Sequence, residues 1–191
     1  MTGIRSFIAV ELSDDLHSAL DVLIRSLQTR RLNSVRWVLP ANIHITLKFL
    51  GDVAPKQFES LQKVILETAN ACRPFNITCR DLGAFPNLNR PRVLWAGVQA
   101  PPELAVLAKA IDDHTRPLGF PGEDRPFSPH LTLGRVQPTA DPAALRAITQ
   151  VLQEIKPGVI GTTQIDHITL FKSDLRPSGP VYSVMNRFPL S

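Results

Sequence analysis

Apolar residues recur along this chain with two different periods. A spacing of three to four residues over 14–30, 55–69, 101–115 and 142–157 predicts four helices. Alternating or short apolar runs predict strands at 4–11, 35–38, 43–50, 75–82, 92–98, 130–136, 159–171 and 181–188. Ser13 and Asp141 stand where the N-caps of the first and last helices are expected. Helices and strands mixed in this order predict an α+β fold with largely antiparallel sheets.

The order of these elements repeats in the second half of the chain. The strand near 43 and the helix near 55 return near 129 and 141, each 86 residues later. This spacing predicts a duplicated unit: one two-lobed domain over 1–191, with halves at about 1–99 and 100–191 related by a pseudo-twofold axis. We expect the sheets to line a central cleft and the helices to lie outside. The Gly- and Pro-rich segment 117–129 predicts a loop, and a place beside a ligand is one reason for its length.

The composition narrows the class of protein. The 191 residues carry a formal net charge of +4, which is compatible with an anionic ligand without requiring one. The two cysteines, Cys72 and Cys79, form no CxxC pair, so a zinc ribbon or thioredoxin-type site is excluded. The sequence contains neither the glycine-rich nucleotide motifs nor a GxSxG elbow. No uninterrupted apolar run could span a membrane and Glu11 interrupts any signal-peptide core, so we expect a cytoplasmic protein.

One tetrapeptide pattern, His-apolar-Thr-Leu, occurs three times in predicted strands. The copies carry the pairs His44–Thr46, His130–Thr132 and His167–Thr169. In a strand each histidine shares a face with the threonine two residues on, about 6.6 Å away. One such run is typical of any amphipathic strand, but two at equivalent places in a duplicated unit are far more specific. His44 and His130 are 86 residues apart, whereas the position equivalent to His167 is Asp81. We therefore expect His44 and His130 to face each other and His167 to be structural.

Two histidines and two threonines on opposite walls of a cleft suit phosphoryl transfer. One neutral imidazole can act as a general base while the other, protonated, acts as a general acid. The threonine hydroxyls can donate hydrogen bonds to phosphate oxygens as charge develops on them. A metal site is the competing interpretation, because histidine also binds zinc. Two histidines lack the third protein ligand that catalytic zinc sites have, so we expect neither a metal nor a cofactor.

The sequence around the two histidines resembles a known family. The matching segments are Arg36-Trp37-Val38, 42–51 (NIHITLKFLG) and 128–135 (SPHLTLGR), with weaker matches at 5–10, 92–95 and 170–173. They resemble the two-histidine phosphoesterase superfamily, and within it the RNA 2′,3′-cyclic phosphodiesterases, formerly called 2′-5′ RNA ligases. The resemblance covers nearly the whole chain, and both motifs are intact.

The resemblance implies a bilobal α+β fold and metal-independent hydrolysis of RNA 2′,3′-cyclic phosphate ends to 2′-phosphates. It also implies weak, reversible joining of tRNA halves through a 2′-5′ linkage. Carried over residue by residue, it makes His44 and His130 the acid–base pair, with His44 favoured as the acid. Thr46 and Thr132 become donors to the phosphate, and Arg135 becomes a substrate-binding residue.

Strand parity raises questions about two residues beside the motifs, and a basic cluster lies close to the first motif. Arg135 should point away from the face of His130, unless a β-bulge at Gly134 redirects it. An exposed surface arginine is the alternative. Phe49 also breaks the alternation, and we expect it in the core rather than as a stacking platform for a base. The basic cluster Arg30, Arg31 and Arg36 could guide RNA, although a solvated helix end explains it as well.

Three functions remain open on the sequence alone. The first is the RNA cyclic phosphodiesterase, acting as a monomer away from any membrane. The second is an enzyme of the same superfamily acting on 2′-5′ oligonucleotides or small cyclic phosphates. The third is an RNA-end-binding module without turnover. Two intact His–Thr pairs favour an enzyme, because binding alone would not require both imidazoles.

Overall fold

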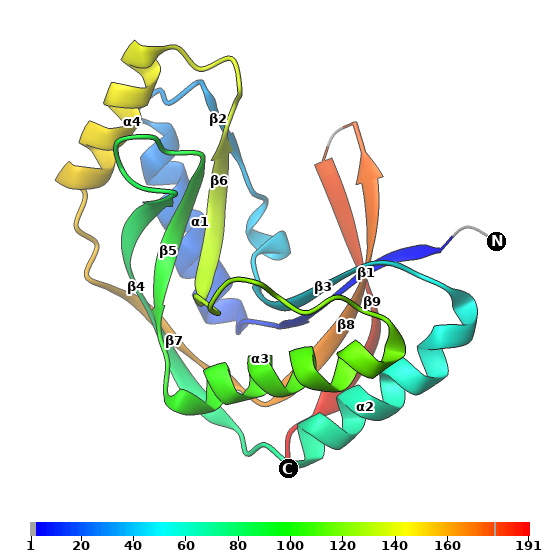
Figure 1. Ribbon diagram of the computed structural model, residues 1–191. Coiled ribbons are helices and arrows are strands. Elements are labelled where there is room, and N and C mark those ends of the chain that lie inside the picture. Colours follow the sequence, from blue (N-terminus) through cyan, green and yellow to red (C-terminus); the bar gives the residue numbers. More distant parts are fainter. Residues whose placement is uncertain (1–2, 178) are drawn as a thin grey trace.

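The fold consists of two antiparallel sheets flanked by helices (Figure 1). The computed structural model describes residues 3–177 and 179–191. In this part of the chain the first sheet has the strand order β3-β1-β8-β9 and the second has the order β2-β6-β5-β4-β7. The strands are β1 (Ile4–Val10), β2 (Val35–Trp37), β3 (Ile45–Val53), β4 (Phe75–Phe85), β5 (Val93–Gln99), β6 (His130–Val136), β7 (Val159–Ile165), β8 (His167–Arg176) and β9 (Gly179–Pro189). The expected α+β class with antiparallel pairing is confirmed.

The four α-helices lie where the 3.6-residue period predicts them. They are α1 (Asp14–Gln28), α2 (Phe58–Asn70), α3 (Pro102–Thr115) and α4 (Pro142–Glu154), and short 3₁₀ turns cover Pro40–Asn42, Pro55–Gln57 and Arg116–Leu118. Both expected caps are present: the Ser13 side chain accepts from the Leu16 N–H at 3.3 Å, and Asp141 accepts from the Ala144 N–H at 2.7 Å. Each cap satisfies a backbone donor that the first helical turn leaves without a partner.

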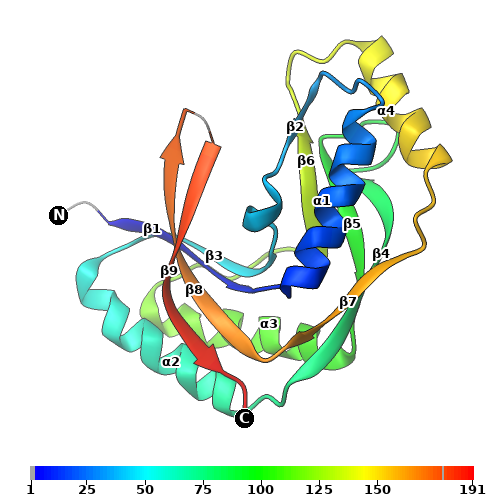
Figure 2. The ribbon, with the colours of Figure 1, turned by 180° about the vertical axis from the view of Figure 1, so that it is seen from behind.

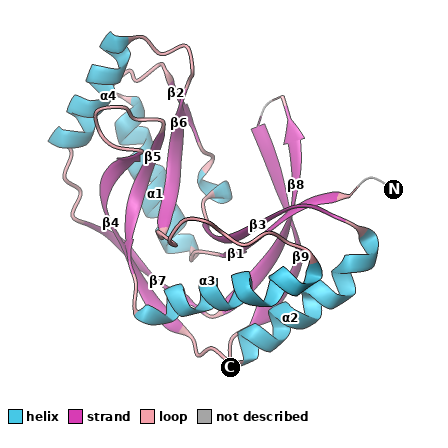
Figure 3. Cartoon of the chain, viewed as in Figure 1, coloured by secondary structure: helices cyan, strands magenta, loops and turns pink. Residues whose placement is uncertain are grey.

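The two sheets do not follow the two sequence halves. β6, from the second half, lies between β2 and β5 of the first half, and β8 pairs with β1 (Figure 3). The predicted strand 159–171 is therefore two strands: β7 ends at Ile165 in the second sheet, and after Asp166 the chain begins β8 in the first.

Two helices pack on the sheet opposite to the one that holds the strand before them. α1 follows β1 of the first sheet but packs on β7 of the second, whereas α3 follows β5 of the second sheet and packs on β3 and α2 (Figure 2). Of the segment 117–129 expected as a loop, Pro117 and Leu118 belong to a 3₁₀ turn, and 119–129 is a loop that leads directly into β6.

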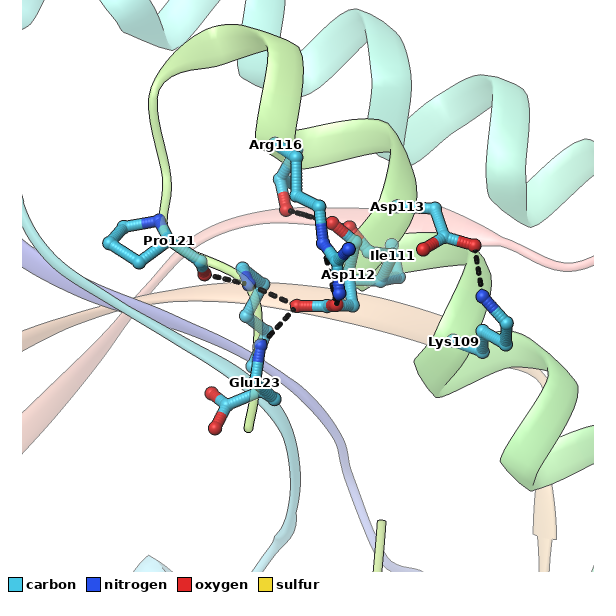
Figure 4. Close-up of polar contacts among 9 residues, drawn as sticks. Lys109, Ile111, Asp112, Asp113, Arg116, Pro121 and Glu123 are labelled. Carbon is cyan, nitrogen blue, oxygen red and sulfur yellow. Dashed lines mark hydrogen bonds and ion pairs between the residues drawn. The ribbon is translucent and has the colours of Figure 1, made fainter. Parts of the chain in front are cut away.

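A buried lysine ties this loop to the first sheet. The Lys48 side chain on β3 has no exposed surface, and its Nζ donates to the Asp112 carboxylate on α3 and, at 2.7 Å, to the Pro121 carbonyl. Asp112 Oδ1 also accepts from the Glu123 N–H at 3.1 Å, and Oδ2 accepts from Arg116 at 2.5 Å (Figure 4). Burial alone would raise the pKa of Asp112, but these donors lower it below its usual value. The network thus holds an ionised carboxylate among its donors.

Replacing Lys48 tests how much this pair contributes. We expect Lys48→Met to lower the free energy of unfolding by about 3–5 kcal/mol, because it leaves the Asp112 charge buried without its main partner. Urea unfolding followed by circular dichroism measures the change. Lys109→Met is the matched control, because Lys109 pairs with Asp113 at 2.5 Å on the same helix with its side chain 75% exposed. An equal loss of stability in both variants would contradict the role given to the buried pair.

Candidate active site

The two motif histidines are held by the same hydrogen bond. His44 directly precedes β3 and His130 is the first residue of β6. His44 Nδ1 lies 2.9 Å from the Asn42 carbonyl, and His130 Nδ1 lies 2.8 Å from the Ser128 carbonyl. A carbonyl oxygen can only accept, so Nδ1 carries the proton in both rings. Nε2 is therefore the nitrogen that gains or loses a proton in each imidazole.

An aromatic cluster surrounds His44. The His44 ring stacks on Phe7 of β1 at a centroid distance of 4.7 Å and meets Tyr182 of β9 edge-on at 5.3 Å. Phe171 of β8 also stacks on Phe7, at a centroid distance of 5.0 Å. Burial among these rings lowers the pKa of His44 to about 4, although the bond to the Asn42 carbonyl and the charge of Glu11 oppose the shift. At neutral pH the unliganded protein therefore holds His44 in its neutral form.

His130 has a more open environment. Its ring meets the edge of Phe85 on β4 at 4.9 Å, and Phe85 in turn lies 5.4 Å from the Trp95 ring on β5. The two histidines thus share a tautomer and a backbone anchor but differ in how much apolar surface covers them.

A β-bulge follows the threonine in each motif. On β3, Thr46 pairs with Ala9 and Lys48 with Ile8, so Leu47 is an extra residue. On β6, Thr132 pairs with Trp95 and Gly134 with Leu94, so Leu133 is the extra residue. Of the two alternatives for Arg135, a bulge is therefore present, with Leu133 rather than Gly134 as its extra residue, and β3 carries its equivalent 86 residues earlier.

The bulge in β6 brings Arg135 onto the face of Thr132. β5 is regular here, so Trp95 and Val93 share a face, and their partners on β6 are Thr132 and Arg135. Arg135 is exposed. Burial raises the pKa of the Tyr182 hydroxyl in the first sheet, and the positive charge of Arg135 offsets part of that rise. Gly134 lies on the opposite face, where a Cβ would come within 2.7 Å of Val35.

The bulge in β3 corrects the expectation for Phe49. Phe49 pairs with Phe7, and Thr46 pairs with Ala9. Phe7 and Ala9 share one face of β1, so Phe49 and Thr46 lie on the face of β3 that carries His44. Its side chain is 63% exposed, with a centroid distance of 6.2 Å to Phe7. The placement of Phe49 in the core was wrong because strict alternation ignores the extra residue.

The basic cluster near 30–36 is split by the fold. Arg36 pairs directly with Arg135 across β2 and β6, so the two exposed guanidinium-bearing side chains share one face. Like charges placed this way repel each other, and an anion between them would remove the repulsion. Arg30 instead lies 3.9 Å from Glu154 of α4. Only Arg36 of the cluster therefore stands beside a motif strand.

The third histidine motif serves an ion-pair network. His167 Nε2 lies 2.9 Å from Glu11, whose carboxylate also accepts from Thr169 at 2.6 Å and from Arg187 at 2.6 Å. Arg187 contributes most to lowering the pKa of Glu11 to about 2. The expectation of a structural histidine agrees with these contacts. Two further histidines lie outside the three motifs: His114 is exposed, whereas His17 is half-buried and donates to the Ile43 carbonyl at 3.0 Å.

Two absences apply to the described ranges 3–177 and 179–191. They contain no cluster of three or more His, Cys, Asp or Glu side chains arranged to hold a metal ion. They also contain no helix whose length and apolar character would let it cross a membrane.

Comparison with known proteins identifies the family. The model of the family described as LigT like Phosphoesterase matches residues 10–95 and again 97–182. Proteins named RNA 2′,3′-cyclic phosphodiesterase are similar over nearly the full length: one from Methanothermobacter thermautotrophicus is 33% identical over 98% of this chain and 99% of its own. Another, from Archaeoglobus fulgidus, is 32% identical over 96% of this chain and 99% of its own.

Solved structures agree with the sequence matches. A crystal structure of a Thermus thermophilus protein superposes with a TM-score of 0.80 at 29% identity, covering 97% of both chains. E. coli LigT in complex with 3′-AMP superposes with a TM-score of 0.74 at 25% identity, covering 99% of both chains. Two successive matches to one family model, each containing one of the two motifs, together with these full-length likenesses, show that the chain belongs to the LigT-like phosphoesterases of the two-histidine superfamily.

Proposed function

We propose that this phosphoesterase hydrolyses 2′,3′-cyclic phosphate ends of RNA to 2′-phosphates without a metal ion. The observation that carries the proposal is the matched pair of imidazoles, each with Nδ1 bound to a carbonyl and Nε2 left as the reactive nitrogen. The names of the full-length relatives support the RNA substrate, and the 3′-AMP bound to E. coli LigT supports a nucleotide in the site.

The proposed reaction assigns one proton transfer to each histidine. His130 takes a proton from water as the water oxygen attacks phosphorus. The P–O3′ bond breaks, and His44 gives its Nε2 proton to the departing O3′, which leaves the phosphate on O2′. Thr46 and Thr132 donate to the non-bridging oxygens, and Arg135 offsets their negative charge. For both hydroxyls, no hydrogen-bond partner is present among the described residues, which leaves them available to the substrate.

The acid role requires His44 to gain its proton when substrate binds, because its pKa of about 4 leaves it neutral in the free protein. A singly charged phosphate about 4 Å away contributes about 4 kcal/mol at an effective dielectric constant of 20. That energy corresponds to about 3 pKa units in favour of the imidazolium. Bound substrate would thus bring His44 into the range in which an acid works near neutral pH.

The same groups could join RNA ends. If the 5′-hydroxyl of a second RNA replaces water, His130 takes its proton and the product is a 2′-5′ linkage. We include this weak, reversible ligation in the proposal, with tRNA halves or other cyclic-phosphate oligonucleotides as partners. We also propose that one chain over 1–191 acts as a single two-lobed domain and as a monomer, because both motifs belong to the same chain. We propose a cytoplasmic location because the relatives are named for an activity on RNA.

Alanine substitution tests the histidine pair. His44→Ala and His130→Ala should each lower turnover of a nucleoside 2′,3′-cyclic phosphate by roughly 10²-fold or more, because each removes a proton-transfer partner. His167→Ala, which alters the Glu11 network instead, should leave turnover nearly unchanged. Steady-state kinetics on folded variants decides the matter. Equal damage from His167→Ala would mean that the wrong pair has been chosen.

Chelation and product analysis test the metal-free route. Activity should survive EDTA, because two histidines make an incomplete zinc site. Phosphorus NMR should show a 2′-phosphate, because the proposed acid protonates O3′. Loss of activity in EDTA that zinc or manganese restores would refute the metal-free route, and a 3′-phosphate product would refute the assignment of the leaving oxygen.

Titration of His44 by NMR tests its role as the acid. In the free protein its pKa should lie near 4, because burial disfavours the charged ring. Saturation with a nucleoside 2′-phosphate should raise that pKa toward neutrality, since the added negative charge favours the imidazolium. An unchanged pKa in the complex would show that the phosphate does not bind beside His44. The ring of His114, exposed on α3, provides the internal control and should not respond.

A further inference from the structure

A shallow, open hollow of about 510 Å³ lies on the second sheet. Its lining includes Trp95, Gly97 and Gln99 of β5 and Arg80 of β4. Gly97 pairs directly with His130, and Arg80 pairs with Gly97, so the three form a row across β6, β5 and β4 (Figure 1). Neighbouring strands are about 4.8 Å apart. The hollow thus begins one strand away from the reactive imidazole, a gap that a single ribose can bridge.

One glycine lets the Trp95 ring lie against the sheet. A Cβ on Gly83, its partner on β4, would come within 2.2 Å of the indole, whereas a Cβ on Gly97 would meet the ring at an ordinary contact distance of 3.5 Å. One face of the ring therefore lies over backbone that only glycine permits, and the half-buried ring contributes to the wall of the hollow. A flat aromatic surface in this position is typical of sites that stack a nucleobase.

The rim of the hollow carries hydrogen-bonding groups suited to the edge of a base. Arg80 donates to the Asp81 carboxylate at 2.9 Å and to the Gln99 side-chain oxygen at 3.3 Å. These bonds hold the guanidinium over the sheet. The Gln99 amide N–H groups have no partner among the described residues, so they are available as donors.

We infer that this hollow binds the base of the nucleotide whose cyclic phosphate lies between His44 and His130, with Trp95 as its stacking platform. The inference rests on the proposed function for the position of the phosphate, and it adds a base subsite that none of the histidine, threonine or arginine residues above provides. Stacking accepts every base, so the site favours nucleoside substrates over baseless ones without reading sequence strictly.

Kinetics on paired substrates test the subsite. Trp95→Leu should raise KM for a nucleoside 2′,3′-cyclic phosphate by roughly 10-fold, the size expected for losing one stacked base, with kcat retained. KM for ribose 2′,3′-cyclic phosphate, which has the reacting group but no base, should not change. Trp95→Phe should restore most of the affinity, because it keeps an aromatic face. A KM increase of the same size on both substrates would overturn the inference.

A fluorescence titration keeps this test separate from catalysis. The chain has two tryptophans, Trp37 and Trp95, so Trp37→Phe leaves Trp95 as the only reporter. Nucleoside 2′-phosphate should quench its emission, and ribose 2-phosphate should not. Equal quenching by both ligands, or by neither, would overturn the subsite. If the protein turned over no cyclic phosphate at all, the proposed function would fail, and this titration would still report on base binding.

Discussion

One hydrogen bond, made twice, sets the chemistry of this protein. Each motif histidine donates Nδ1–H to the carbonyl two residues before it, and that bond fixes both the tautomer and the ring orientation. Without it either nitrogen could carry the proton, and Nε2 would have no assigned role. Because the partner is main chain rather than a side chain, the bond depends on the path of the backbone into β3 and β6. The bulges, threonines and neighbouring strands all build on these two anchored rings.

Duplication supplied two equal motifs, and the surrounding residues made them unequal. His44 lies among aromatic rings contributed by β1, β8 and β9, and its pKa falls to about 4. His130 touches Phe85 and lies beside an open hollow. The residues that follow the two bulges differ as well: Phe49 follows the bulge in β3, and Arg135 follows the bulge in β6. Identical tetrapeptide patterns thus lie in different surroundings, and the apolar surroundings rather than the motif lower the pKa of His44.

The sequence predicted what depends on local period and spacing. The helix positions, both caps and most strand positions follow from the local pattern, and the structure agrees, although the strand expected at 159–171 is two strands. Contacts between distant segments could not be predicted in this way. The rings around His44 come from strands far along the chain, as with Tyr182 of β9, and the partner of Lys48 lies on a helix of the other half. Phe49 was misplaced because a bulge is a tertiary feature that alternation cannot reveal.

The exchange of strands between halves has a consequence for motion. β6 lies between β2 and β5, and β1 is bonded to β8, so the two halves share continuous backbone ladders rather than a hinge. Separating them would break several rows of hydrogen bonds at once. The two sequence halves therefore cannot swing apart as two bodies on a linker. The two imidazoles belong to different sheets, His44 beside β3 and His130 on β6, and among the described residues no backbone ladder joins those sheets. Any change in the spacing of the two histidines must therefore arise as a shift of one whole sheet against the other.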